Sequence, residues 1–250
     1  MQFVDDPLFD GMVFVLEGQN NTTLKAFTPI EAIEWFGYDA YNPIFNVPIF
    51  NEAIHSIDDD ATPFIFAGTD SDDRIITNKY HTTDIYAGDG DDIIEIRAIA
   101  DRSKGGEYSF TIGGDGSDTI TGSDGDDTIY GDFSGAHNHD LGDGDDTIYG
   151  NGGNDEIDGQ AGSDEIYGGE GDDVIIGNFG DDTLYGEAGN DTIRDDQGAN
   201  YLDGGEGNDT LESRSLSGNH TLIGGSGQDN ITGTGETLYI DAGEGQDNIN

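Results

Sequence analysis

The sequence predicts an all-β fold, namely a right-handed parallel β-roll of nonapeptide repeats that follows a small mixed N-terminal cap. Three observations carry this prediction. A nine-residue motif recurs without a gap from Leu141 to Glu212. Glycine and proline are segregated along the 250 residues, and the formal net charge is -46, from 54 acidic and 8 basic residues. Tight turns, short strands and a large unbalanced charge must therefore coexist in one structure.

The chain divides into two compositions near Phe66. Only Gly11, Gly18 and Gly37 precede residue 67, whereas all five prolines lie before it. A long array without proline suits paired strands, because proline cannot donate a ladder hydrogen bond. We therefore expect a non-repeat region at 1–66 and the roll at 67–250, best formed over 113–130, 141–212 and 224–250.

The non-repeat region has the features of a cap over the first turn, which solenoids require. Thr28 to Glu31 is a capping box with proline at the first helical position, and it predicts a short helix. Pro48 to Ile54 is a candidate second helix, and Met12 to Leu16 is a candidate strand.

Each position of the nonapeptide has a physical task. Glycine at positions one, two and four permits positive φ and a tight turn. Position six is aspartate, and position eight is isoleucine or leucine between polar or aromatic neighbours, which is the alternation of a three-residue strand. One unit cannot bury its apolar side chain alone, so two units should form one turn and the true period should be eighteen residues.

Position nine supports the eighteen-residue turn. Tyrosine recurs there at Tyr130, Tyr149, Tyr167 and Tyr185, with intervals of 19, 18 and 18 residues. The first interval predicts that residues 131–140 fill one half-turn with ten residues instead of nine. Residues 96–112 break the register and are expected to form about one metal-free turn, and residues 213–223 an over-long half-turn.

Carboxylates beside exposed glycine carbonyls make an all-oxygen environment, which suits calcium. The motif matches G-G-x-G-x-D-x-U-x, and residues 67–250 resemble the RTX (repeats-in-toxin) family of hemolysin-type calcium-binding repeats. The resemblance implies multiple Ca²⁺ ions, each between loops two units apart. It implies position-six carboxylate ligands at Asp73, Asp92, Asp118, Asp127, Asp146, Asp155, Asp164, Asp173, Asp182, Asp191, Asp209, Asp229 and Asp247. It implies carbonyl ligands at Gly142, Gly144, Gly159, Ala161, Gly168, Gly169, Gly171, Gly186, Ala188, Gly204, Gly225 and Gly227.

The resemblance also pairs the loops across one turn. On one edge, Asp146 should face Asp164 and Asp164 should face Asp182. On the other edge the implied pairs are Asp155 with Asp173, Asp173 with Asp191, Asp191 with Asp209, and Asp229 with Asp247. Three residues, Thr83, Asn200 and Leu238, stand where aspartate belongs, so sites that share their loops should be weak or empty.

Composition limits the partners. A polyanion with so few basic residues cannot neutralise phosphates, which argues against nucleic acid and anionic membrane. Cysteine is absent, no apolar run approaches a membrane span, and Met1 to Asp10 carries three aspartates where a Sec-type signal needs positive charge. No H-E-x-x-H, G-x-S-x-G or P-loop occurs, so an enzyme is not expected.

The charge also suggests how the roll folds. No lysine or arginine lies between Gly105 and Ile193, so stacked aspartates have no internal counter-charge. We expect calcium binding and folding to be one event that occurs after export. The resemblance implies an extracellular, secreted protein of the type I secretion pathway. Because a repeat ends at Asn250 without the usual repeat-free tail, either the gene continues or export follows another route.

Several alternatives stay open. The array could be a flexible linker, although a linker needs no register. The tyrosines could bind carbohydrate or merely stack, and the threonines at position seven could form an ice-binding face or reflect β propensity. His137, His139 and Asp140 could bind a transition metal or form a solvated loop. The functional hypotheses are a structural or adhesive protein with an extracellular polysaccharide or cell-surface protein as partner, an RTX module of a larger secreted enzyme or toxin, and a carbohydrate-binding module.

Overall fold

The computed structural model describes residues 64–67, 72–77, 83–96, 109–132 and 144–250. Most of the expected cap lies outside the described residues, as do both of its candidate helices, its candidate strand and the cluster of His137, His139 and Asp140. The first strand, β1 (Phe64–Ala67), spans the boundary that the composition predicts. Among the described residues no helix is found, and none that could cross a membrane.

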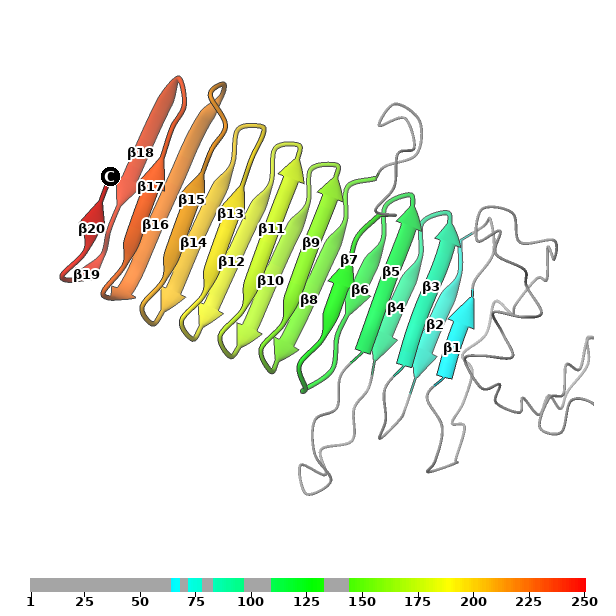
Figure 1. Cartoon of the computed structure of the whole chain (residues 1–250). Coiled ribbons are helices and arrows are strands. Elements are labelled where there is room, and N and C mark those ends of the chain that lie inside the picture. Colours follow the sequence, from blue (N-terminus) through cyan, green and yellow to red (C-terminus); the bar gives the residue numbers. More distant parts are fainter. Residues whose placement is uncertain (1–63, 68–71, 78–82, 97–108, 133–143) are drawn as a thin grey trace, which may run out of the picture.

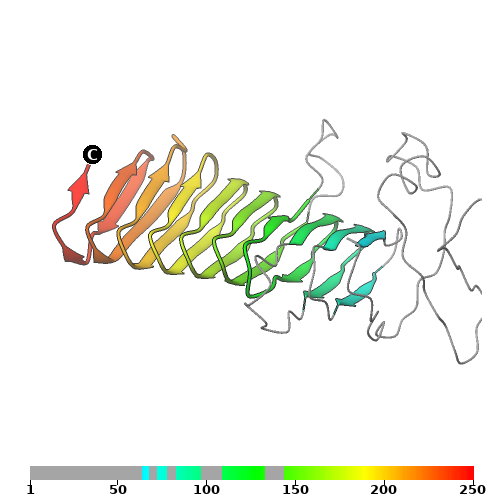
Figure 2. The ribbon, with the colours of Figure 1, turned by 60° about the horizontal axis from the view of Figure 1, so that its bottom comes forward.

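In the described residues, twenty strands form two parallel sheets of ten strands each, and successive strands up to β18 alternate between the sheets (Figure 1). Sheet 1 contains β1, β3 (Thr83–Asp89), β5 (Ser109–Asp115), β7 (Thr128–Tyr130), β9 (Glu156–Ala161), β11 (Val174–Phe179), β13 (Thr192–Asp195), β15 (Thr210–Ser213), β17 (Asn230–Gly233) and β20 (Asn248–Ile249). Sheet 2 contains β2 (Arg74–Thr77), β4 (Ile93–Ile96), β6 (Thr119–Thr121), β8 (Thr147–Gly152), β10 (Glu165–Glu170), β12 (Thr183–Ala188), β14 (Tyr201–Glu206), β16 (Asn219–Gly227), β18 (Thr237–Asp241) and β19 (Glu244–Gly245). The predicted all-β parallel roll is confirmed, with loops joining the two sheets along both edges (Figure 2).

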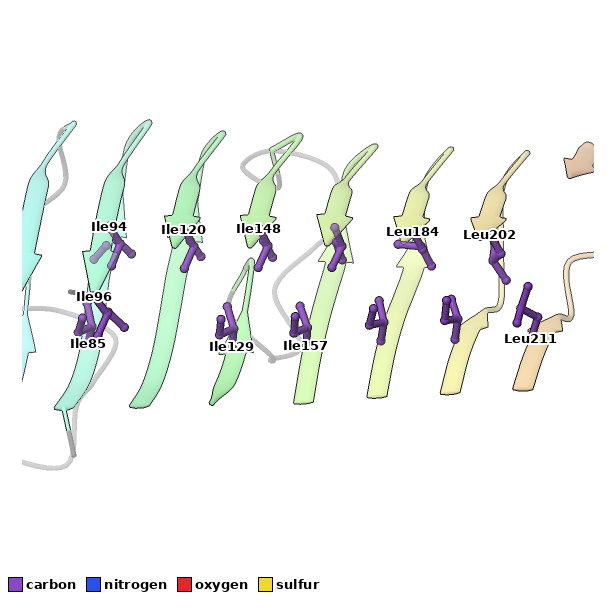
Figure 3. Packing of buried hydrophobic residues seen from close by; sticks show 14 of the residues in the cluster. Ile85, Ile94, Ile96, Ile120, Ile129, Ile148, Ile157, Leu184, Leu202 and Leu211 are labelled. Carbon is purple, nitrogen blue, oxygen red and sulfur yellow. The ribbon is translucent and has the colours of Figure 1, made fainter. Parts of the chain in front are cut away.

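The core is the row of position-eight side chains from each sheet, which face one another between the sheets (Figure 3). Ile166 of β10 pairs with Ile148 and Leu184 of the adjacent strands, so the eighteen-residue period is confirmed. Burial of one such side chain contributes about 1.5 to 3 kcal/mol, and each unit contributes only one. The fully buried members include Ile85, Ile94, Ile120, Ile129, Ile148, Ile157, Ile166, Ile175, Leu184, Ile193, Leu202 and Leu211.

Two breaks in the register contribute fewer half-turns than the sequence predicts. Among the described residues, β7 of sheet 1 is followed directly by β8 of sheet 2, so the extra half-turn expected between Tyr130 and Tyr149 is not found. Likewise, β4 of sheet 2 is followed by β5 of sheet 1, so residues 96–112 do not make a full turn. The over-long half-turn at 213–223 is confirmed, because Tyr201 pairs with Thr221.

The units after β7 therefore lie on the opposite sheet from the one that counting in nines predicts, and this changes which tyrosines form the ladder. Tyr130 belongs to sheet 1 and lies 5.8 Å from Phe110, whereas the ladder on sheet 2 starts at Tyr149. Ring centroids along this ladder are 5.0 Å apart for Tyr149 and Tyr167, and 4.8 Å apart for Tyr167 and Tyr185. Tyr201 extends it at 5.6 Å from Tyr185. The prediction that Tyr130 shares this ladder is wrong.

Candidate metal centre

The position-six aspartates form two carboxylate rows, one along each edge of the roll. Each residue stands immediately before a strand, so its backbone is held by the sheet that follows. In most turns the backbone N–H of one member donates a hydrogen bond to Oδ1 of the member one turn later, for example from Asp146 to Asp164 at 2.9 Å and from Asp155 to Asp173 at 2.8 Å. The described structure therefore brings together the pairs that the repeat pattern implies. Row 1, before the strands of sheet 1, is Asp127, Asp155, Asp173, Asp191, Asp209, Asp229 and Asp247, and row 2, before those of sheet 2, is Asp73, Asp92, Asp118, Asp146, Asp164 and Asp182.

The rows are buried, apart from the half-buried end members Asp73 and Asp247. Asp164, for example, has 1% of its surface exposed, and its Oδ2 receives no hydrogen bond from the described residues. Asp127 differs, because its Oδ2 accepts from the Ser123 backbone N–H at 2.6 Å. The Oδ2 atom is left without a donor in Asp92, Asp118, Asp146, Asp155, Asp164, Asp173, Asp182, Asp191, Asp209 and Asp229.

In nine of these ten residues, all but Asp92, the unpartnered Oδ2 faces a small space above the α-carbon of a position-one glycine, which we call the niche. Asp92 has Ala87 at position one of its unit. A β-carbon built on Gly168 would overlap Oδ2 of Asp173 and lie 3.0 Å from the carbonyl oxygen of Gly186, the position-one residue one turn later. Gly168 does not have a left-handed backbone, so glycine is needed there for space. This corrects the expectation of positive φ at position one. At positions two and four the expectation is confirmed, as in Gly169 (φ 119°) and Gly171 (φ 136°).

The other expected carbonyl ligands lie around the same loops. The position-one carbonyls of Gly159, Gly168 and Gly204 enter the niches of the preceding turn in the manner of Gly186. The position-four carbonyls of Gly144, Gly171 and Gly227 point at the position-four glycine one turn later. The position-two carbonyl of Gly225 likewise points at Gly243, the position-two glycine one turn later. At position three, the Ala188 carbonyl accepts the Gly171 N–H at 2.8 Å, and the Ala161 N–H donates to Asp132. Gly142 lies outside the described residues.

Burial in the rows favours the neutral carboxyl group. Desolvation, reinforced by neighbouring carboxylates, raises the pKa of Asp164 to about 8 and that of Asp146 to about 10. The same causes raise the pKa of Asp118 and of Asp155 to about 8. Hydrogen bonds from the backbone oppose these shifts without cancelling them. The charged form of each row therefore needs a counter-charge that the neighbouring side chains do not supply.

The residues fit a calcium ion. The niche offers a buried carboxylate oxygen that lacks a donor and a carbonyl oxygen from the next turn, with a cradle that a β-carbon would fill. Such oxygen-only donors suit Ca²⁺, whereas Mg²⁺ demands a smaller octahedral arrangement. Within the described part of the chain, no three histidine, aspartate or glutamate side chains converge as a metal-binding group, so the backbone carbonyls would have to complete each site.

Sequence reasoning missed a second ladder at position five. There the side-chain oxygen accepts the N–H of position five one turn later, from Ser163 to Asp145 at 2.7 Å and from Asp172 to Asn154 at 2.8 Å. It also missed that insertions place His220 at position six of row 2, where its Nδ1 accepts the Asn200 N–H at 3.3 Å. The recurrence of Asp, Asn and Ser at position five was the sequence signal for the position-five ladder. The place of His220 could be found only from the strand register.

Comparison with known proteins agrees with this geometry. Residues 112–133, 140–175 and 176–211 match the family model of the RTX calcium-binding nonapeptide repeat, in four copies. No curated protein matches the chain. The matched residues include most members of both carboxylate rows and the niches that these members face. Across the matched residues, the repeats of this chain are therefore similar to the RTX calcium-binding nonapeptide repeat.

Proposed function

We propose that the protein binds several Ca²⁺ ions in the niches of both carboxylate rows and that this binding drives the roll to fold. The observation that carries the proposal is the set of buried Oδ2 atoms without a donor, most of which lie at a niche that also holds a carbonyl oxygen of the next turn. In this proposal the position-six aspartates and the loop carbonyls of positions one to four hold the ions, and calcium supplies the positive charge that the rows lack.

Electrostatics supports the coupling of binding to folding. Equivalent aspartates on neighbouring strands lie about 4.8 Å apart, and each charged pair costs just under ~1 kcal/mol even at the dielectric of water. The cost accumulates along each row, and burial increases it. The burial of one inward Ile or Leu side chain per unit opposes this cost. Ordering of the chain adds a further cost of about 1 to 2 kcal/mol for each residue. Calcium binding free energy would then appear as folding free energy.

The same coupling suits a secreted protein. Extracellular calcium modules bind with Kd of about 10⁻⁴ to 10⁻³ M, which leaves such a chain unfolded in a cytosol and folded outside the cell. RTX repeats are typical of extracellular proteins, and type I secretion is the route that we propose. The role is structural or adhesive, with an extracellular polysaccharide or a cell-surface protein as the partner class, or as the RTX module of a larger secreted enzyme or toxin.

The geometry of the tyrosine ladder favours stacking over a carbohydrate platform. The rings of Tyr149, Tyr167 and Tyr185 are nearly parallel, with interplanar angles of 8° and 11°, so each covers the face of the next. The Tyr167 hydroxyl donates to Glu165 at 2.6 Å. Sugar recognition by an aromatic strip needs exposed ring faces, and here neighbouring rings occupy them.

Circular dichroism of the full chain tests the proposal. Calcium-stripped protein at pH 7.5 should lack strand signal and should gain it cooperatively as calcium rises through the millimolar range. Equal concentrations of Mg²⁺ serve as the control and should have little effect. An identical spectrum with and without 5 mM calcium, together with no bound calcium by mass spectrometry, would refute it. Binding to a glycan array with and without calcium separates an adhesive role from a purely structural one.

A further inference from the structure

One turn of row 2 departs from the repeat at two positions simultaneously. The unit that begins at residue 195 carries Asn200 in place of the position-six aspartate, and it carries Asp195 in place of the position-one glycine. The register places Asp195 directly after Arg194 in β13, paired with Ser213 of the following turn. A carboxylate has therefore moved from one end of the loop to the other within the same unit.

The relocated carboxylate points into the niche of the preceding turn. A β-carbon built on Gly177 would overlap Oδ2 of Asp182, as in other turns, and would also overlap Oδ2 of Asp195. In most turns with the standard repeat sequence, the second oxygen in the niche is the position-one carbonyl oxygen of the next turn. Here a side-chain carboxylate oxygen takes that place, so the niche above Gly177 is bounded by two carboxylates.

In both carboxylates Oδ1 accepts a backbone N–H and Oδ2 has no donor among the described residues. Oδ1 of Asp182 accepts the Asp164 N–H at 2.9 Å, as in the other row members, whereas Oδ1 of Asp195 accepts the Gln197 N–H of its own loop at 2.9 Å. Asp195 is 0% exposed and Asp182 is 1% exposed. The two arginines near this loop do not neutralise them, because Arg194 pairs with Asp196 and Arg214 pairs with Glu212 at 2.7 Å.

Asn200 cannot supply the missing charge. Its Oδ1 accepts the Asp182 N–H at 2.9 Å, which keeps the ladder intact, and its Nδ2 donates to the Gln197 carbonyl at 2.8 Å. Beyond it, the position-six places of row 2 hold His220 and Leu238. Among the described residues, the loop that begins at Asp195 is thus the last one along row 2 that brings a carboxylate to a niche.

We propose that Asp182 and Asp195 together form a calcium site above Gly177, at the turn where the repeat pattern predicts a weak or empty one. Asp195 supplies the carboxylate that Asn200 lacks, and the column of ions on this edge ends there. This proposal rests on the proposed function, since it assigns one more ion to the same system of niches.

Counting bound ions on the full chain tests the site. Native mass spectrometry at a fixed millimolar calcium concentration should find one ion fewer in Asp195→Asn than in the unaltered chain, with an unchanged circular dichroism spectrum. Asp196→Asn, one residue along and paired with Arg194, is the matched control and should retain the full number. The double variant Asp195→Gly with Asn200→Asp restores the repeat pattern, so it should regain the ion.

The outcomes separate this site from the function as a whole. An unaltered chain that binds no calcium would overturn the proposed function and this site with it. A calcium-binding chain in which Asp195→Asn keeps every ion would overturn this site alone. If Asp195→Asn failed to fold, the single variant Asp195→Gly, which has the usual residue of position one, takes its place: one ion fewer supports the site, and the full number of ions overturns it.

Discussion

Replacing Asp164 with asparagine should make the calcium-free roll more stable and make it respond less to calcium. The Asp164 carboxyl has its pKa raised from 3.8 to about 8, so its unfavourable contribution is absent below about pH 4 and grows until about pH 8. At pH 7 the linkage amounts to about 4 kcal/mol as an upper value, because each pH unit above 3.8 costs about 1.36 kcal/mol. Asparagine removes this cost. Its Oδ1 can still accept the Asp146 N–H, as Asn200 accepts that of Asp182.

The same substitution should weaken calcium linkage, since the Oδ2 of Asp164 faces the niche above Gly159. At 5 mM calcium each lost ion removes about 1 to 2 kcal/mol, for Kd of about 10⁻³ to 10⁻⁴ M. Urea unfolding at a series of calcium concentrations measures both effects. The slope of the unfolding free energy against the logarithm of calcium concentration reports the number of ions taken up on folding, and it should fall by one.

A matched control is Asp181→Asn, which removes an equal charge from an exposed position five whose oxygen accepts the Ala199 N–H at 2.8 Å. Its calcium slope should not change, and its stability should shift by less than about 0.5 kcal/mol. The reasoning fails if Asp164→Asn keeps the full calcium slope, or if its unfolding free energy at pH 7, extrapolated to zero calcium, is lower than that of the unaltered chain.

Three further predictions follow from the same geometry. The unaltered, calcium-free chain should gain strand signal by circular dichroism as the pH falls from 8 to about 4.5, because the pKa of Asp173 is raised to about 6, that of Asp191 to about 7 and that of Asp118 to about 8; a signal that stays flat would contradict it. Gly168→Ala should lose one calcium ion by native mass spectrometry, whereas Gly152→Ala, where the nearest atom to the new β-carbon is 3.8 Å away, should keep them all; equal losses would refute the niche. In saturating calcium, Ile166→Ala should lower the urea unfolding free energy by about 2 to 5 kcal/mol, and Val174→Ala, at a side chain 41% exposed, by less than about 1 kcal/mol; similar losses would mean that the core does not carry the stability.

Much of the roll is local, and so the sequence predicts it well. A unit of nine residues contains its own turn, its own strand and its own inward side chain, and this is why Ile166 or Leu184 can be assigned to the core without knowledge of neighbours. The two-unit turn follows because a three-residue strand can only be stabilised by stacking. The position-six aspartates are equally plain, since they stand at one phase of the repeat.

What the sequence could not predict depends on which sheet each unit joins. Tyr130 was expected beside Tyr149 because counting in nines treats residues 131–140 as a half-turn, yet a connection can lengthen without contributing a strand. Once the strand pairing is known, Tyr130 belongs to sheet 1 and His220 falls into row 2. Position-one glycine was likewise explained by backbone conformation, although the space over its α-carbon is what matters at Gly168.

The sequence by itself therefore determined the period, the inward side chains, the two carboxylate rows and their oxygen-donor chemistry, because each is written within one nonapeptide. Only the tertiary structure decided which loops face one another, where each unpartnered oxygen points and how Asp195 comes to lie beside Asp182. The reason is that these relations join residues one turn apart, and the length of a turn is set by the strand pairing and not by the repeat.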